Sequence, residues 1–185
     1  MTVEEWNFSR PVQKIAIIGN GGGGKSTLAR RLGQELNLPV YSVDDYAWQP
    51  GWQPTSSEDM SGIHGDWLSQ PGWVIDGWGS WDLIEQRFDD ADLVVFVDFP
   101  LSLHYRWAIK RQVQAALGLS PGWPPPGCRA STITFRLMKT LWAVHKELRP
   151  RLVRMTSEEP LNLRTVVVKS PVELGCLRAG FGEAS

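Results

Sequence analysis

The segment Gly19–Ser26, with the sequence Gly-Asn-Gly-Gly-Gly-Gly-Lys-Ser, constrains the fold of this chain more than any other stretch. It fits G-x-x-x-x-G-K-[ST], the pattern of a phosphate-binding loop. A short apolar run rich in β-branched residues precedes it at 14–18, which is typical of a buried parallel strand. Leu28, Leu32 and Leu36 follow it four residues apart, on one face of a helix. Because strand, motif and helix coincide, we predict a phosphate-binding loop rather than a plain glycine-rich turn.

The residue types in this loop are those that a bound triphosphate requires. Glycines let backbone N–H groups approach the phosphate oxygens closely, and the N-terminus of the following helix adds a partial positive charge. We expect Lys25 to reach the β- and γ-phosphates of ATP and the Ser26 hydroxyl to bind Mg²⁺. The residues predicted to hold the nucleotide are Gly19, Asn20, Gly21, Gly22, Gly23, Gly24, Lys25, Ser26 and Thr27.

Composition is that of a globular protein with one domain. The 185 residues are 42% hydrophobic and 21% charged, which is enough for a substantial core. A net charge of −1 provides no electrostatic footprint for nucleic acid, so nucleic acid is not expected as a partner. No run is apolar enough to span a bilayer, and we recognise no signal peptide. Two distant cysteines, Cys128 and Cys176, favour reduced thiols and a cytoplasmic location. We expect a monomer or a homodimer.

Apolar runs alternate with helical patterns, which predicts an α/β fold with a mostly parallel sheet. The predicted strands are 14–18, 40–43, 73–75, 93–97 and 165–168. The predicted helices after the loop helix include 56–68, which opens with a capping box at Ser56, and 80–88, 102–117 and 132–148. Segments 48–54 and 118–129 are predicted loops, and residues 1–13 are predicted to be an N-terminal extension of a single domain at 1–185.

Acidic residues follow three of the predicted strands, at the sheet edge where α/β proteins place their ligands. Asp76 is the preferred candidate for Mg²⁺ binding, and the alternative is that it caps the turn before Ser80. Asp44 is the candidate that grips or deprotonates an acceptor hydroxyl, although a turn or helix-capping role is nearly as well supported. Asp98 precedes Phe99-Pro100, which favours a structural turn.

Several further residues have two interpretations. Trp48 and Trp52 could stack on an acceptor, although covering apolar surface is the commoner use of tryptophan. Arg87 could reach a phosphate or form a surface ion pair. The three histidines stand alone on helical stretches and are expected to be structural or surface residues, namely His64, His104 and His145.

The quoted residues together resemble a known family. The chain is similar to the adenylate-kinase-like branch of P-loop kinases, and most of all to the DNA topology modulation proteins. The matching pieces, spread from Lys14 to Leu177, are Gly19–Ser26, Val43-Asp44, Trp48–Trp52, Trp73–Gly77, Val97–Pro100, Arg106–Arg111, Gly127-Cys128 and Arg149–Leu152. This resemblance implies a three-layer sandwich, in which helices cover both faces of a five-stranded parallel sheet with strand order 2-3-1-4-5.

The chain departs from that family at two places. The family usually continues Asp-Gly with Asn-Tyr-Ser and an arginine, whereas Gly77 is followed here by Trp78-Gly79-Ser80-Trp81. Its lid loop also tends to be more basic than residues 120–126. Both departures concern the part of the family that meets the phosphoryl acceptor. They favour an acceptor that is more apolar or aromatic.

The segment at about 101–130 is predicted to form a mobile lid that brings positive charge to the transferred phosphoryl group. Its candidate catalytic cations are Arg106, Lys110 and Arg111. At 3.6 residues per turn, Arg106 falls within an apolar stripe that we predict to be packed. The residues of this stripe are Tyr105, Ile109, Val113, Ala116 and Leu117. A bound phosphate would offset the cost of burying Arg106, and an ion pair with a carboxylate is an equal alternative.

Three functions compete on these residues. The first is a small-molecule kinase that moves the γ-phosphoryl group of ATP to a nucleoside, nucleotide or hydroxylated metabolite. The second is an ATPase or switch that acts on a nucleic-acid or protein partner, and the third is a nucleotide-binding module without catalysis. ATPases commonly place a glutamate after the strand-end aspartate, whereas Gly77 follows Asp76 and Phe99 follows Asp98. The sequence therefore favours the kinase, with Lys25 and Asp44 among its catalytic residues.

Overall fold

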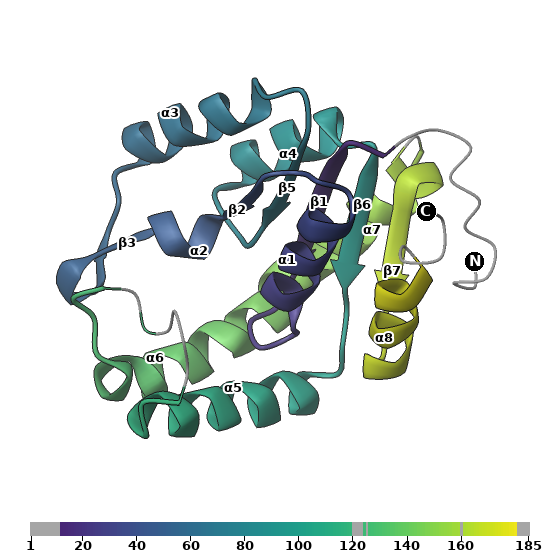
Figure 1. The fold of residues 1–185 in the computed structure, drawn as a ribbon. Coiled ribbons are helices and arrows are strands. Elements are labelled where there is room, and N and C mark those ends of the chain that lie inside the picture. Colours follow the sequence, from purple (N-terminus) through teal and green to yellow (C-terminus); the bar gives the residue numbers. More distant parts are fainter. Residues whose placement is uncertain (1–11, 120–123, 125, 160, 181–185) are drawn as a thin grey trace.

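A parallel sheet of five strands forms the centre of the molecule (Figure 1). The computed structural model describes residues 12–119, 124, 126–159 and 161–180. In spatial order the strands are β2 (Val40–Ser42), β5 (Trp73–Asp76), β1 (Lys14–Gly19), β6 (Leu93–Val97) and β7 (Thr165–Val168). All neighbouring pairs run parallel. The segments predicted as strands are those that build this sheet, and β2 ends one residue earlier than expected.

The predicted strand order of 2-3-1-4-5 has to be corrected to 2-5-1-6-7. The difference arises in the segment 48–54, which was predicted to be a loop. It contains two short strands, β3 (Trp48–Gln49) and β4 (Gln53–Pro54), which pair antiparallel around the 3₁₀ turn η2 (Pro50–Trp52). Strands of two residues are too short to show the alternation that identifies a strand in a sequence. They form a separate hairpin, so the strands that follow them carry higher numbers.

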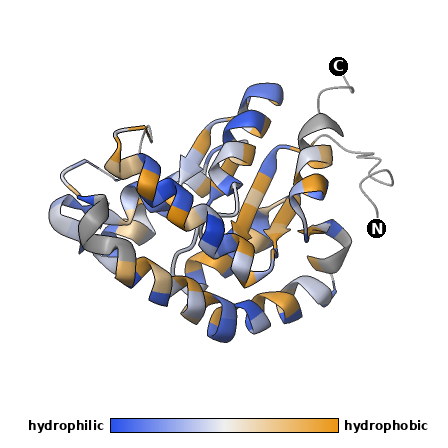
Figure 2. Cartoon of the chain, turned by 90° about the horizontal axis from the view of Figure 1, so that it is seen from below, coloured by the Kyte–Doolittle hydropathy of each residue, from blue (hydrophilic) through white to orange (hydrophobic). Residues whose placement is uncertain are grey.

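Helices cover both faces of the sheet. On one face, Ala16 and Ile18 of β1 belong to a hydrophobic core with Val43, directly after β2, and with residues of three longer helices. On the other face, Ile15 and Ile17 pack with residues of two further helices. The first set consists of α3 (Ser57–Leu68), α4 (Trp81–Asp90) and α7 (Arg149–Ser157), and the second of α1 (Lys25–Glu35) and α8 (Pro171–Gly180). Figure 2 shows that the central strands are mostly hydrophobic, whereas hydrophobic and hydrophilic residues alternate along the helices. This confirms the predicted α/β fold with helices on both faces.

Two neighbouring helices lie beyond the carboxyl ends of the strands, at the bottom of Figure 1. They are α5 (Leu101–Ala116) and α6 (Ala130–Ala143), and both were predicted within a few residues. A π-helical turn, η3 (Val144–Leu148), joins α6 directly to α7. The remaining elements are α2 (Val43–Tyr46), a single turn after β2, and the 3₁₀ turn η4 (Leu161–Arg164) before β7. Among the described helices, none has the length and apolarity needed to cross a bilayer.

The face by which α5 packs differs from the prediction. The buried residues of α5 are His104, Ala108 and Gln112, whereas Ile109 and Val113 of the predicted stripe are each more than half exposed. The stripe was wrong because α5 packs against the backbone of the phosphate-binding loop, where a small residue and polar side chains fit better than large apolar ones. Of the predicted lid at 101–130, residues 120–123 and 125 lie outside the described residues, as do residues 1–11 of the predicted extension.

The capping box and the hairpin show how the chain positions the segments around the site. The backbone N–H of Asp59 donates to the Ser56 hydroxyl at 3.0 Å, which confirms the predicted start of α3. In the hairpin, the Gly51 N–H donates to the Gly127 carbonyl at 3.1 Å. The indole N–H of Trp52 donates to the Arg129 carbonyl at the same distance. These two bonds attach the hairpin to the segment that leads into α6.

Candidate functional site

The phosphate-binding loop connects β1 to α1, as the sequence predicts. Gly22 and Gly24 have positive φ values of 73° and 76°, a conformation that favours glycine. Gly24 occupies the N-cap position of α1. A Cβ atom at Gly22 would lie 3.0 Å from the His104 carbonyl oxygen and 3.1 Å from the Ala108 nitrogen. The run of four glycines therefore allows α5 to pack closely against the loop, in addition to any role with phosphate.

His104 supports this loop from α5, which sequence reasoning did not anticipate. Its side chain is almost fully buried, and Nδ1 lies 2.8 Å from the Gly21 carbonyl oxygen. Burial lowers the pKa of His104 to about 4, and the nearby Lys25 ammonium adds to this effect. The ring is therefore neutral near pH 7, and Nδ1–H donates to the Gly21 carbonyl. No motif points to this histidine, because its partner is a backbone atom 83 residues earlier.

Lys25 and Asp76 form the buried charged centre of the site. The Lys25 ammonium donates to the Asn20 carbonyl at 3.1 Å, and only 7% of the residue is exposed. Burial lowers the pKa of Lys25, while the charges of Asp44 and Asp76 oppose that shift. Burial also raises the pKa of Asp76, and this is opposed first by Lys25 and then by the Ser26 hydroxyl. The lysine and serine of the motif thus lie beside the carboxylate predicted to help bind metal.

The other polar side chains of the motif segment are those of Asn20, Ser26 and Thr27. The Asn20 side-chain amide donates to the Leu141 carbonyl of α6 at 2.8 Å, and its oxygen accepts from the Gly21 N–H at 2.8 Å. Asn20 therefore holds the loop to α6 through its side chain. Ser26 is half-buried and Thr27 is exposed, both in the first turn of α1.

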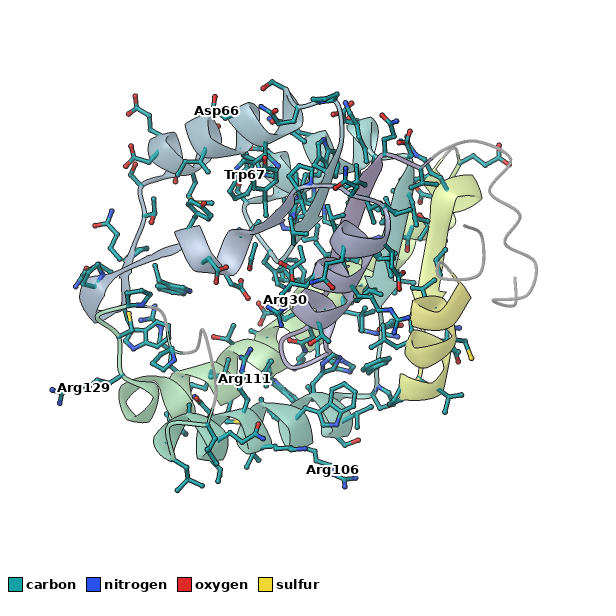
Figure 3. The ribbon with its side chains drawn as sticks, viewed as in Figure 1. Arg30, Asp66, Trp67, Arg106, Arg111 and Arg129 are labelled. Carbon is teal, nitrogen blue, oxygen red and sulfur yellow. The ribbon has the colours of Figure 1, made fainter. Side chains whose placement is uncertain are left out.

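Asp44 and Arg111 both lie near the Lys25 ammonium of the loop. Asp44 lies in the single turn α2, which follows β2, and its side chain is exposed. Arg111 extends from α5 toward the interior of the site (Figure 3). Burial lowers the pKa of Arg111, and the Asp44 carboxylate opposes that shift. Of the three predicted cations on α5, Arg111 is the one that the fold turns toward the phosphate-binding loop.

The placement of Arg106 corrects the sequence prediction. Arg106 points away from the body of the molecule (Figure 3) and is exposed, and Lys110 is exposed as well. Helical geometry explains this, because the buried positions 104, 108 and 112 fix the inward face of α5, and residues 106 and 110 fall outside it. The predicted apolar stripe selected the wrong face of α5, and of the three candidate cations Arg111 is the one that lies toward the site.

Arg87 and Asp98 have structural partners. Arg87 is 1% exposed and donates to the carbonyls of Gly77 at 3.1 Å and Trp78 at 3.3 Å. Arg87 therefore stabilises the turn after Asp76 from inside the fold. It was expected either to contact a phosphate or to form a surface ion pair, and its backbone partners differ from both. Asp98 accepts two hydrogen bonds from the Arg149 guanidinium, at 2.5 and 2.8 Å. This ion pair agrees with the structural role expected for Asp98.

A cavity of about 730 Å³ adjoins the phosphate-binding loop. Asn20, Gly21, Asp44 and Arg111 line its end beside the loop. The hairpin, α3, the turn after β5, α4 and α6 provide most of its other walls, with side chains that include Trp48, Trp52, Met60, Trp78, Leu83 and Leu137. Its volume lies within the range of small-molecule sites, about 300–1,000 Å³. The cavity thus lies beside the phosphate-binding loop and is large enough for a small molecule.

The buried carboxylate of Asp76 suits Mg²⁺. Its Oδ1 atom has no hydrogen-bond partner among the described residues, which leaves a buried acceptor available for another ligand. The Ser26 hydroxyl beside it supplies a second oxygen ligand of the kind that Mg²⁺ takes. No group of three or more His, Cys, Asp or Glu side chains within the described ranges forms a complete metal site. Mg²⁺ commonly binds through one or two protein ligands together with substrate phosphates, so these residues fit it.

Comparison with known proteins gives structural matches alone. No protein-family model matches the chain, and no curated protein matches it in sequence. A shikimate kinase from Bacteroides thetaiotaomicron has a TM-score of 0.52 at 15% identity, over 93% of this chain and 97% of that one. A gluconokinase from Sinorhizobium meliloti 1021 has a TM-score of 0.51 at 17% identity, over 94% of each chain. A shikimate kinase from Acinetobacter baumannii in complex with shikimate has a TM-score of 0.51 at 13% identity, over 91% and 90%. At such identities the likeness shows the fold: this chain has the α/β architecture of these kinases.

Proposed function

We propose that this protein is an ATP-dependent small-molecule kinase of the P-loop type. The observation that carries the proposal is the grouping of Lys25, Ser26 and Asp76 at the carboxyl ends of the parallel strands. These are a cation, a hydroxyl and a carboxylate, the groups that phosphoryl transfer from ATP requires. The shared fold with shikimate kinases and a gluconokinase supports the same conclusion.

Each residue has a proposed role in the transfer. The loop backbone from Gly19 to Thr27 binds the phosphates of ATP, and Lys25 neutralises charge on the β- and γ-phosphates. Ser26 and Asp76 would hold Mg²⁺, which neutralises phosphate charge when bound. Asp44 accepts the proton of the acceptor hydroxyl, and Arg111 places its guanidinium against the transferred group. Arg111 takes the role first expected of Arg106 and Lys110, because it faces the loop.

Transfer to an acceptor is favoured over hydrolysis. Gly77 follows Asp76, in the place where many ATPases carry a water-activating glutamate. The walls of the cavity are largely apolar and aromatic, which suits an organic acceptor better than a path for water. The cytoplasmic location, the monomeric or dimeric state and the relation to DNA topology modulation proteins remain predictions.

The kinase proposal can be tested by ATP binding and ADP release. Calorimetry with Mg²⁺ and a non-hydrolysable ATP analogue should detect binding to the wild-type chain. ADP release should be slow when no acceptor is added. It should become faster when a panel of nucleosides, nucleotides and hydroxylated metabolites includes an accepted substrate. Lys25→Ala should lower the stimulated rate by about a hundredfold or more, because it removes a direct contact to the transferring phosphates.

Two results would contradict the proposal. Absence of any affinity for ATP would exclude phosphoryl transfer from this nucleotide. A fast rate without acceptor that rises further with duplex DNA would favour the ATPase instead. Arg106→Ala serves as the matched control for Lys25→Ala, because Arg106 is an exposed cation that points away from the site.

A further inference from the structure

Tryptophan rings with fixed orientations form part of the wall of the acceptor cavity. The indole N–H of Trp78 donates to the Gly19 carbonyl at 3.1 Å, and that of Trp52 donates to the Arg129 carbonyl at 3.1 Å. An indole has a single donor. Because both donors already have partners, these two side chains offer an occupant ring surface.

Neighbouring side chains hold these rings in place. Trp78 packs edge-on against Trp81, with ring centroids 6.0 Å apart, and the Arg151 guanidinium lies 4.1 Å from the Trp81 ring. Trp52 packs edge-on against Trp48 at 5.7 Å. Rings held by such contacts present a preorganised apolar surface, which binds a flat ring at a low cost in side-chain entropy.

The charged residues of the cavity are balanced in number. Among the described residues that line it are two acids, Asp44 and Asp82, and two bases, Arg111 and Arg136. Arg111 lies in the field of Asp44 at the loop end. The Arg136 guanidinium lies 5.7 Å from the centre of the Trp48 ring. Each arginine thus already has a neighbour in the lining, a carboxylate for Arg111 and an aromatic ring for Arg136.

From this lining we infer that the acceptor is an uncharged alcohol carried on a flat aromatic ring system. The inference rests on the proposed kinase function. The acceptor oxygen forms a bond to the γ-phosphorus of ATP, the bond from that phosphorus to the β–γ bridging oxygen breaks, and ADP leaves. The hydroxyl proton passes to the Asp44 carboxylate and then to solvent. Nucleosides and simple aryl alcohols share this chemistry.

Matched pairs of probes test this substrate class. One pair is adenosine and adenosine 3′-monophosphate, which both keep the 5′-hydroxyl, and the other is 2-(1-naphthyl)ethanol and 3-(1-naphthyl)lactate. Within each pair the second compound adds an anion. We expect at least one uncharged member to bind in calorimetry with the ATP analogue present and to raise ADP release about tenfold or more over its charged partner. The pair that responds shows whether the acceptor hydroxyl is carried on a nucleoside or on another aromatic compound.

A pair of variants localises the effect. Trp48→Leu keeps an apolar side chain and removes the ring, and it should raise KM for the uncharged acceptor about tenfold while KM for ATP stays unchanged. Trp142→Leu is the matched control, because Trp142 is a half-exposed tryptophan of α6 outside the cavity lining. A preference for the charged members that disappears in Arg136→Gln would overturn the inference. Binding of ATP without binding of either uncharged probe would overturn it too, and the kinase function would stand.

Discussion

Asp44 and Asp76 both act on the Lys25 ammonium, yet their surroundings give them different roles. Asp76 is 2% exposed and has a free carboxylate oxygen among the described residues, whereas Asp44 is exposed at the cavity. Asp76→Asn should therefore raise the Mg²⁺ concentration needed for half-maximal activity, because the amide is a weaker metal ligand. Asp44→Asn should keep ATP affinity and lower transfer by about a hundredfold or more, because it removes the proposed proton acceptor. Loss of ATP affinity in Asp44→Asn alone would show that the roles are reversed.

The two arginines of α5 give a second test at the scale of single residues. Arg111→Lys should lower turnover about tenfold while ATP affinity changes little, because an ammonium cannot contact a phosphate with two parallel N–H groups. Arg106→Lys is the control on the same helix, and its turnover should match the wild type since Arg106 points away. Steady-state kinetics with a responding acceptor measures both. Unchanged turnover in both variants would mean that α5 acts only through its positive charge, because lysine keeps that charge.

At the scale of elements, the contact between α5 and the phosphate-binding loop is the feature that most needs its residues. Gly22 combines a positive φ with an approach of 3.0 Å to the His104 carbonyl. Gly22→Ala should therefore weaken ATP binding about tenfold and destabilise the fold. Gly62→Ala is the matched control, because a Cβ atom at Gly62 in α3 meets no described atom within 4 Å and alanine favours a helix. Thermal unfolding and calorimetry measure both effects, and an unchanged Gly22→Ala would contradict this account.

The same contact shows what the sequence could predict and what it could not. The strands of the five-stranded sheet and the loop motif follow local patterns, so each of them was found from neighbouring residues. The inward face of α5 was missed because it packs against backbone, which leaves no apolar periodicity to detect. The hairpin was missed because its strands are two residues long and are held by long-range bonds such as that from Gly51 to Gly127. Asp44 and Asp76 were predicted as site residues because the ends of parallel strands converge, whereas Arg111 could be chosen over Arg106 only from tertiary packing.

At the scale of the whole molecule, two buried neutral histidines link stability to pH. Burial is the main cause that lowers the pKa of His64 and of His104 from 6.5 to about 4. At His64, the charge of Arg87 lowers the pKa further. At His104, the charges of Lys25 and His145 lower the pKa further, and the charge of Asp98 opposes this shift. Between pH 6.5 and 4, each histidine binds a proton in the unfolded chain but not in the folded one. The unfolded state then binds more protons, so the free energy of unfolding falls as pH falls through this window.

Urea unfolding at pH 7.0 and 4.5 tests this link. A shift from 6.5 to about 4 corresponds to at most about 3 kcal/mol for each histidine. Asp76 acts in the opposite direction, because its raised pKa means that its ionisation costs stability as pH rises. Measurements in an Asp76→Asn background remove that opposing contribution. There we expect the loss of stability at pH 4.5 to shrink when His104→Asn is added, since asparagine can still donate to Gly21 but does not titrate. If both chains lose the same free energy of unfolding between pH 7.0 and 4.5, with His104 present or replaced, groups other than His104 control the acid response.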